Sequence, residues 1–481
     1  MIEKDSFRIA IVKSITSVVG FFFSLVMHVI EELIESLKSE PTTPYQGALL
    51  PESELLSHWN TGWSIGSKKL DLNLSIQGLL CLGGTGTGKT SNVAITTLNR
   101  PGKASYVCLS PSGDIPQKTS GYLASIGHRI QHLRFEAPFH DQFNPLSRCE
   151  NALDIRKAAT MIYQATMGTN SKDSFWDAMG IELLSIIFTL VLSFEEENQN
   201  LCNANDVLNL MSTDPDKVDA LVVGANIDKL YQDYMAFCTY EEKLRTNVIA
   251  TCRPILAQFG QETLAMFTSG DTIDIQSYRK EPSVLFIEIP VADQAFYAGI
   301  TSILFQQLFT KIFSSLPRKG DLPIFFLLEE FGILKKIPIM PTVLSNIRKY
   351  YCGCCLLLQE ESMLYDIYGK IAASMIANCQ SHLIFTNQPL SKAQEMSTLI
   401  GKHEVKDEHG VKKVQSVLTA DSIRAMDPKY ALLKCGHKRI SKVRLRPYYK
   451  NLWLRHRAKM APAELPIISM KMPPLLRDKA I

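Results

Sequence analysis

The chain has 481 residues, 46% of them apolar and 21% charged, with a formal net charge of +3 at pH 7. This composition is typical of a globular protein of about two to four domains and excludes a long disordered tract. The small net charge gives no sign of nucleic-acid binding by itself, and the eleven cysteines, scattered without paired spacing, indicate buried thiols in a reducing compartment.

An apolar run, Ile15–Ile30, lies near the N-terminus and contains no acidic or basic side chain. Its 16 residues would form a helix about 24 Å long. They are slightly fewer than the roughly 20 residues of a usual membrane span. We expect a membrane anchor or membrane-associated helix with its linker over residues 1–45. A re-entrant helix, a second span from a partner, and a buried oligomerisation helix remain open.

The alternation of Asp71–Ile76 predicts a strand. An apolar run then ends in GGTGTGKT at the spacing of a phosphate-binding P-loop. Glycines let backbone N–H groups face a phosphate, Lys89 can reach the β- and γ-phosphates, and the Thr90 hydroxyl can hold Mg²⁺. A helix should start next and add its positive end. The predicted cofactor site comprises Gly83, Gly84, Thr85, Gly86, Thr87, Gly88, Lys89 and Thr90; a Gly-rich turn that binds nothing is the alternative.

The next segments read as an interrupted α/β pattern. Ala104–Ser110 predicts a buried parallel strand, followed by the loop Pro111–Asp114 at the sheet edge where ligands gather. From 151 to 263 the pattern changes to amphipathic helices, including one from Phe175 to Leu192 and one over Lys243–Phe259, which indicates an all-helical insertion. The apolar part of the first of these is short enough to favour a core helix over a membrane span.

The sheet then resumes with strand Ser283–Ile289, helix Tyr297–Phe313 and strand Ile324–Leu328. The last strand runs into Glu329 and Glu330. An apolar strand that ends in an acidic pair downstream of a P-loop is the Walker B arrangement. One carboxylate lies near Mg²⁺ and the other orients or activates water.

The remaining segments complete the predicted sheet. Strand Cys354–Leu358 precedes Gln359, a helix is expected over Ser362–Tyr368 and a strand over Ser381–Phe385, and Lys402–Lys413 predicts a solvated hairpin or loop. The cysteines at 352, 354 and 355 are interpreted as the start of a buried strand, because no second Cys/His pair stands at a usual zinc spacing.

A basic segment, Lys434–Lys459, holds ten Lys or Arg residues and no Asp or Glu. Its later half interleaves Tyr448, Tyr449 and Trp453 with cations. Three interpretations stay open: a solvated strand and helix with packed aromatics, contact with an anionic membrane leaflet, and a grip on single-stranded nucleic acid.

Taken together, these motifs resemble one known family. The residues that carry the resemblance are the P-loop, Gly121-Tyr122 with Phe143-Asn144-Pro145-Leu146, Trp176-Asp177-Ala178, LLEEFG at 327–332, LLLQEESMLYDIYG at 356–369, and LTADSIRAMDPKYALLKCGHKRI at 418–440. The chain is similar to the type IV secretion coupling proteins, the TraG/TraD-like ATPases of conjugation and effector secretion. The resemblance covers roughly residues 62–449.

This resemblance implies an α/β, RecA-like P-loop nucleotide-binding domain over 46–150 and 264–449, with an inserted all-α domain over 151–263. It further implies an N-terminal membrane anchor. From the composition of the basic segment we expect residues 450–481 to form a basic C-terminal tail. The expected protein is a hexameric ATP-driven coupling ATPase at the cytoplasmic face of the bacterial inner membrane. Its expected partners are the inner-membrane components of the secretion system and either a relaxase–DNA complex or effector proteins with adaptors.

The resemblance also implies roles for individual residues. Glu330 corresponds to the catalytic carboxylate, Gln359 to a polar sensor, and Arg348 to an arginine offered to a neighbouring subunit. Thr90 and Glu329 are the expected Mg²⁺ residues for bound ATP. Two departures affect the expected hydrolysis rate: Glu329 stands where Asp is usual, and Ser110–Asp114 replaces a D-P-K-G-[DE] loop.

Two other functions remain as alternatives. The altered loop at 110–114 keeps open a nucleotide-binding docking platform with little ATP turnover. A cytoplasmic hexameric DNA pump of the same superfamily is the other, although the N-terminal apolar run and the segments at 356–369 and 418–440 argue against it.

Overall fold

The computed structural model describes residues 46–167, 174–406 and 411–468. The expected N-terminal anchor, including Ile15–Ile30, therefore lies outside the described residues. The described residues divide into two compact units, one drawn from 46–48 and 395–419 and the other from 49–394 and 420–468.

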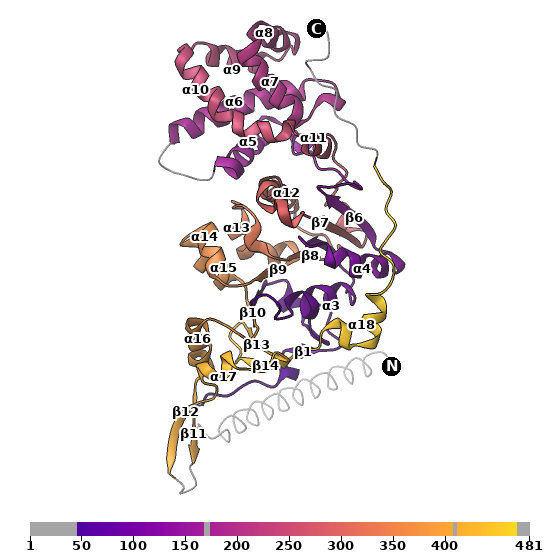
Figure 1. Cartoon of the computed structure of the whole chain (residues 1–481), viewed down its shortest axis with the longest axis vertical. Coiled ribbons are helices and arrows are strands. Elements are labelled where there is room, and N and C mark those ends of the chain that lie inside the picture. The colour runs from indigo at the N-terminus through magenta and orange to yellow at the C-terminus, as the bar shows by residue number, and fades with distance from the viewer. Residues whose placement is uncertain (1–45, 168–173, 407–410, 469–481) are drawn as a thin grey trace, which may run out of the picture. The chain divides into compact units, whose positions relative to one another are not determined.

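A nine-stranded mixed sheet forms the centre of the larger unit (Figure 1). Seven neighbouring strands are parallel and two antiparallel strands extend one side. In spatial order the strands are β14 (Ser441–Arg444), β13 (Tyr430–Cys435), β10 (Ser381–Ile384), β4 (Leu79–Leu82), β9 (Cys352–Leu358), β8 (Ile324–Leu328), β5 (Ser105–Leu109), β7 (Ser283–Glu288) and β6 (Arg129–Arg134). A small sheet of β1 (Leu56–Ser57), β3 (Lys68–Leu70) and β2 (Ser64–Ile65) precedes it.

The central strands are apolar on both faces because helices and the small sheet cover both. Along β8, successive side chains point to opposite faces. Phe325 meets Trp63 edge-to-face at a ring distance of 4.8 Å, whereas Phe326 packs on Phe309 of α12 (Gln294–Phe313) at 4.4 Å. The predicted strands at 104–110, 283–289, 324–328, 354–358 and 381–385 are all confirmed within one or two residues.

The predicted strand over Asp71–Ile76 is wrong. The segment forms a short helix, α2 (Leu72–Ser75). The Asp71 carboxylate caps it by accepting the Asn73 N–H at 2.8 Å, and the Ser75 hydroxyl donates to the Asp71 carbonyl at 2.8 Å. Local hydrogen bonds of this kind override a short alternating pattern. The helix end is further held by the Trp63 indole, which donates to the Ser75 carbonyl at 3.0 Å.

Helices fill the described chain between β6 and β7, where Figure 1 shows them grouped together. They are α5 (Ala152–Met167), α6 (Ser174–Leu192), α7 (Leu201–Thr213), α8 (Pro215–Gly224), α9 (Asp228–Cys238), α10 (Glu242–Ala257) and α11 (Glu262–Phe267). By length and composition α6 alone among the described helices could cross a membrane, but half of its apolar window is buried in the fold. The expected core helix over Phe175–Leu192 is thus confirmed as a helix with a buried face.

The other helices of the larger unit flank the sheet. They are α3 (Ile95–Leu98), α4 (Asp114–Ser125), α13 (Met340–Asn346), α14 (Ser362–Tyr368), α15 (Ile371–Asn378), α17 (Ala420–Arg424) and α18 (Leu452–Arg457); α16 (Leu390–Ile400) belongs to both units. The expected buried strand at the cysteine cluster is confirmed, since every residue of β9 is buried.

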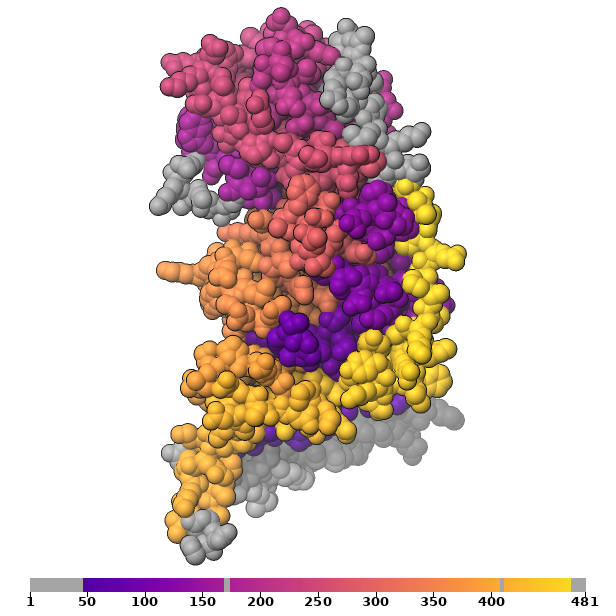
Figure 2. Space-filling model, viewed as in Figure 1, coloured from indigo at the N-terminus to yellow at the C-terminus, as the bar shows by residue number. Residues whose placement is uncertain are grey.

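The C-terminal segment after α18 runs along the surface of α4 toward β6 (Figure 2, yellow). Arg457 donates to the Asn99 carbonyl at 2.6 Å and lies over the Tyr122 ring at 4.2 Å. Ala463 N–H donates to the Ser120 hydroxyl at 3.1 Å. A side chain at Gly121 would collide with the Ala461 carbonyl at 1.8 Å, so the close approach requires glycine there.

The smaller unit contains a two-stranded hairpin of β11 (Lys402–Lys406) and β12 (Lys412–Ser416). The predicted hairpin over Lys402–Lys413 is confirmed, and its turn at 407–410 is outside the described residues. Gly47 N–H donates to the Lys402 carbonyl at 2.7 Å. A Cβ at Gly47 would lie 2.6 Å from the Gly401 carbonyl carbon, which explains the glycine.

Candidate functional site

The phosphate-binding loop leaves β4 at Leu82 and bends back on itself through its glycines. Gly86 and Gly88 have φ angles of 77° and 89°, a region that favours glycine because it has no Cβ. A Cβ at Gly83 would lie 2.6 Å from the Thr87 hydroxyl oxygen, and that hydroxyl donates to the Gly84 carbonyl at 2.8 Å. The loop therefore holds a compact shape that larger residues would open.

Lys89 lies inside the loop. Its Nζ donates to the Gly84 carbonyl at 3.1 Å and to the Gly83 carbonyl. Burial lowers the pKa of Lys89, while nearby acidic groups, including Glu330 and Glu329, act in the opposite direction. The ammonium thus stands in the mouth of the loop with only neutral backbone partners, a position from which it can bind a phosphate.

Thr90 and Glu329 meet across two neighbouring elements. Thr90 opens a π-helical turn, Thr90–Ala94, that continues into α3, so the expected helix after the loop is present. The Thr90 hydroxyl donates to Glu329 Oε1, whereas Glu329 Oε2 is buried without a hydrogen-bond partner. Burial raises the pKa of Glu329 to about 7, against the effects of the Thr90 hydrogen bond and Lys89.

Glu330 follows on the same turn but faces solvent. Its backbone is left-handed, with φ 49° and ψ 46°, which is uncommon for a residue other than glycine and concentrates at functional sites. The Ile333 N–H donates to the Glu330 carbonyl at 2.9 Å and closes the turn. The acidic pair therefore presents one buried and one exposed carboxylate at the carboxyl end of β8.

Strand order brings Gln359 between these groups. β9 pairs with β4 on one side and with β8 on the other, and all three are parallel, so their carboxyl ends share one edge. Gln359 follows β9 and is exposed. We call the loops that follow β4, β5, β8 and β9 the nucleotide edge.

Arg348 is not at this edge. It lies in the turn Ile347–Tyr350, just before β9 begins at Cys352, and its side chain is exposed. A strand of this length spans about 23 Å, so Arg348 stands at the opposite edge of the sheet from Gln359. It cannot reach the nucleotide edge of its own chain.

Two further residues belong to the site although the sequence did not single them out. Asn92 is buried, and its Nδ2 and backbone N–H both donate to the Gly88 carbonyl at 2.9 Å. Its Oδ1 is buried without a partner. Glu288 ends β7, and its carboxyl group would lie 3.0 Å from a Cβ at Gly113 in the altered loop. In the sequence, Glu288 could have been recognised as a site residue because it is an acidic residue at the end of an apolar strand.

Glu288 is also the centre of a cluster of charged side chains beside the altered loop Ser110–Asp114. Its carboxylate pairs with His132 Nε2 at 3.1 Å and with Arg134 at 3.2 Å. These partners, the His132 hydrogen bond first, hold the pKa of Glu288 below its usual value. Ser110 replaces the first acidic residue of the expected loop, and its hydroxyl accepts the Ile115 N–H at 3.3 Å.

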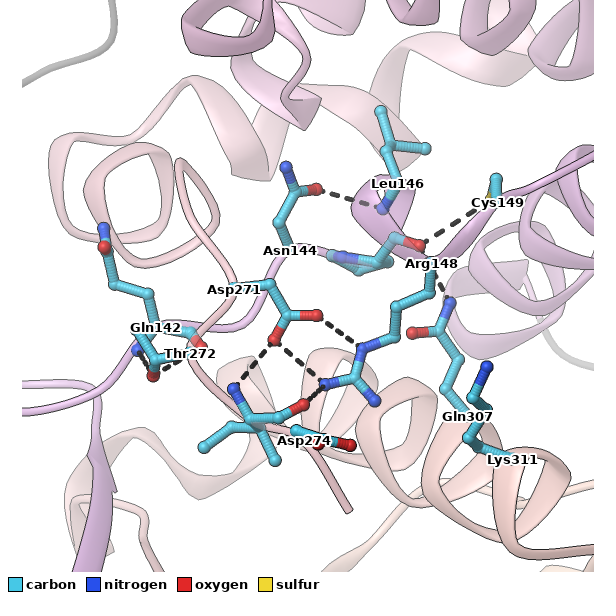
Figure 3. Close-up of polar contacts among 12 residues, drawn as sticks. Gln142, Asn144, Leu146, Arg148, Cys149, Asp271, Thr272, Asp274, Gln307 and Lys311 are labelled. Carbon is cyan, nitrogen blue, oxygen red and sulfur yellow. Dashed lines mark hydrogen bonds and ion pairs between the residues drawn. The ribbon is translucent and has the colours of Figure 1, made fainter. Parts of the chain in front are cut away.

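A second polar cluster joins the helices α5–α11 to the sheet (Figure 3). Arg148 donates to Asp271 from Nε at 2.6 Å and from Nη2 at 2.9 Å, and also to the Ile273 carbonyl at 2.8 Å. Nearby, Gln142 Nε2 donates to the Met266 carbonyl at 2.8 Å. We call this cluster the linker junction, because it fastens together the two segments that enter and leave the helices.

The nucleotide edge fits a nucleotide with Mg²⁺. Mg²⁺ prefers oxygen ligands, and the Thr90 hydroxyl with the unpaired Glu329 Oε2 offers two such atoms side by side. Lys89 and the loop backbone offer donors for phosphate. The chemistry of these groups suits phosphoryl transfer, which depends mainly on positioning and electrostatics.

Comparison with protein families matches residues 45–434 to the family described as Type IV secretory system Conjugative DNA transfer. Comparison with curated proteins finds no match. Among solved structures, the plasmid coupling protein TrwB in complex with the non-hydrolysable GTP analogue GDPNP is 18% identical, with a TM-score of 0.65 over 85% of this chain and 96% of that one. TrwB in complex with ADP and Mg²⁺ gives 18% and 0.64 over the same shares. VirB4 of Thermoanaerobacter pseudethanolicus gives 11% and 0.51 over 82% and 98%.

Proposed function

Because this chain belongs to the family of type IV secretory system conjugative DNA transfer proteins, we propose that it is the ATP-driven coupling protein of such a system. The observation that carries the ATPase proposal is the nucleotide edge. There a P-loop, a buried carboxylate with an unpaired oxygen and an exposed carboxylate on a left-handed turn share the carboxyl ends of neighbouring parallel strands. TrwB, a structural neighbour of the same fold, is known in complex with ADP and Mg²⁺.

In this proposal each residue of the site has one role. Gly83–Gly88 and Lys89 bind the phosphates, and Thr90 with Glu329 holds Mg²⁺, which when bound neutralises charge on the phosphate oxygens. Glu330 accepts a proton from the attacking water, since it is the exposed carboxylate of the pair. Gln359, which follows the strand between β4 and β8, orients that water or the terminal phosphate.

The domain and assembly proposals extend those roles. Residues 151–263 would form an inserted all-α domain, 1–45 a membrane anchor and 450–481 a basic tail. A homohexameric ring at the cytoplasmic face of the bacterial inner membrane would receive a relaxase–DNA complex or effector proteins. Arg348, at the opposite edge of the sheet, would then act only from a neighbouring subunit.

The test is steady-state ATP hydrolysis by the full chain, with and without single-stranded DNA. We expect hydrolysis that requires Mg²⁺ and rises with DNA. Lys89→Ala should reduce turnover by about 10²–10³-fold, because it removes a charge placed to stabilise the developing phosphate charge. Lys103→Ala is the matched control, since Lys103 is an exposed lysine at the opposite end of β5.

A docking platform with little turnover is the second candidate, favoured by Ser110 in place of an acidic residue beside the site. Under that function the parental chain would bind ATP tightly but hydrolyse it at a rate that neither DNA nor Lys89→Ala changes. Parental hydrolysis that exceeds the Lys89→Ala rate rejects the platform.

A further inference from the structure

A basic pocket lies in the larger unit, away from the nucleotide edge. It is a cavity of about 690 Å³ between the β2–β3 turn and the chain that follows β14. Its charged lining residues are Glu52, Lys68, Lys429, Arg444, Arg446 and Lys450. Five cations thus share one cavity with a single carboxylate.

That carboxylate is already engaged. Glu52 Oε1 pairs with Lys68 Nζ at 3.1 Å, and Oε2 accepts the Arg444 backbone N–H at 2.9 Å. Lys429 pairs with Asp427 at 3.3 Å. In the described part of the chain the side chains of Arg444, Arg446 and Lys450 form no ion pair and are exposed. The pocket therefore carries a surplus of positive charge directed at solvent.

The backbone fixes this arrangement. A Cβ at Gly66, in the β2–β3 turn, would lie 2.7 Å from the Arg446 backbone nitrogen, so the two walls touch. The Arg446 guanidinium donates from Nη2 to the Lys450 carbonyl at 3.3 Å, and the Leu445 backbone N–H donates to the Lys429 carbonyl at 2.7 Å. The cations are held on a short, hydrogen-bonded stretch of chain.

Apolar side chains lie on both sides of the last cation, Lys450. Tyr449, which precedes it, is 52% exposed, and Leu452 and Trp453, which open α18, are 81% and 77% exposed. Asn451 caps this helix by accepting the Trp453 and Leu454 N–H groups. Exposed aromatic and aliphatic side chains beside unpaired cations are typical of surfaces that lie in the headgroup layer of a membrane.

We propose that the basic pocket, with Leu452 and Trp453, binds the phosphate headgroups of anionic lipids on the cytoplasmic leaflet. The guanidinium groups of Arg444 and Arg446 suit phosphate oxygens, and the two apolar side chains suit the acyl boundary. An exposed leucine has no partner in a nucleic-acid backbone, which favours lipid over DNA. The apolar run Ile15–Ile30 also precedes Glu52 in the sequence by only about twenty residues.

The test compares binding of the full chain to vesicles of phosphatidylcholine alone and of phosphatidylcholine with one quarter phosphatidylglycerol, without nucleotide. Only the increase in vesicle affinity that the anionic lipid produces, called the gain, is assigned to the pocket. An apolar anchor would bind both kinds of vesicle and does not contribute to it. Arg444→Gln, Arg446→Gln and Lys450→Gln together should reduce that gain on the order of 100-fold at low salt, from roughly fivefold per cation.

The matched control removes the same charge elsewhere. Arg156→Gln, Lys243→Gln and Arg253→Gln, on α5 and α10, should leave the gain within about twofold. Equal losses in both triple variants would show a net-charge effect and overturn the proposal. A pocket variant that keeps its vesicle gain but loses salt-sensitive binding of a labelled oligonucleotide would assign the pocket to DNA instead.

A second measurement reports how deeply the start of α18 inserts into the membrane. Brominated acyl chains should quench the tryptophan fluorescence of the parental chain bound to anionic vesicles, and Trp453→Phe should remove most of that quenching. Quenching that persists in Trp453→Phe would overturn the insertion of α18. Both measurements are independent of ATP turnover, so their failure leaves the ATPase proposal standing.

Discussion

The nucleotide edge and the linker junction each hold a carboxylate away from bulk solvent, Glu329 buried and Asp271 half-buried, but the two carboxylates differ in their partners. At the junction, Asp271 meets the Arg148 guanidinium through both of its oxygens. At the nucleotide edge, Glu329 has one oxygen on Thr90 and one without a partner. A buried polar atom left unpaired costs free energy. The difference indicates that the junction is built for holding two segments together, and the nucleotide edge for receiving a ligand.

The largest expected effect is a loss of ATP hydrolysis when Glu330, at the nucleotide edge, is changed. Glu330→Gln keeps the shape of the side chain but removes its basicity, so ATP hydrolysis should fall by about 10²–10⁴-fold while ATP affinity stays near parental. Turnover and binding of a fluorescent nucleotide measure the two quantities separately. Glu281→Gln, an exposed carboxylate at the other end of β7, is the control, and parental turnover in Glu330→Gln would show that the base lies elsewhere.

A smaller effect is expected at the linker junction. Arg148→Ala leaves Asp271 without its guanidinium, and the free energy of unfolding should drop by about 3 kcal/mol. The unfolding midpoint in urea measures the loss. Arg148→Lys keeps the charge but not the two-pronged contact, so it should recover only part of it. Full recovery by lysine would mean that charge alone holds the junction.

The smallest effect sharpens the comparison, because the same chemical change should have opposite signs at the two sites. Asp271→Asn should lower the free energy of unfolding by about 2 kcal/mol, since it breaks an ion pair. Glu329→Gln, measured above pH 7 with EDTA and without nucleotide, should raise it by about 1 kcal/mol. Burial raises the pKa of Glu329 to about 7, so above that pH the substitution removes a buried charge that has one unpaired oxygen. Losses of equal size at both sites would contradict the idea that Glu329 is held in reserve for a ligand.

Most interior parallel strands could be predicted from sequence because they are largely apolar runs, whereas the edge strand β6 consists mostly of polar residues. The predicted bounds of β8 equal the observed ones, and the predicted hairpin and cysteine-bearing strand are both present. Asp71–Ile76 misled because its alternating pattern is short enough for one Asp cap to override. The tertiary connections were out of reach, since nothing in Ala461–Ile468 indicates that the segment packs on α4 and reaches Phe139.

The candidate site was predicted in its parts but not in its arrangement. The P-loop, the acidic pair and Gln359 each follow an apolar strand, which is a local signal. That β9 lies between β4 and β8 is a property of strand order, which local patterns do not encode. Arg348 stands apart from these groups because it precedes β9 rather than follows it, and its expected role toward a neighbouring subunit stays a prediction.

The order of the strands has a consequence for motion. Strands β4, β9, β8 and β5, which carry the nucleotide edge, are all interior, whereas β14 and β6 are the edges. Interior amides exchange with solvent only when much of a fold opens. ATP binding should therefore leave the amide hydrogen exchange of these four strands almost unchanged and slow exchange only in the loops that follow them. The sheet would then act as a rigid frame, and conformational changes caused by the nucleotide would be confined to its loops.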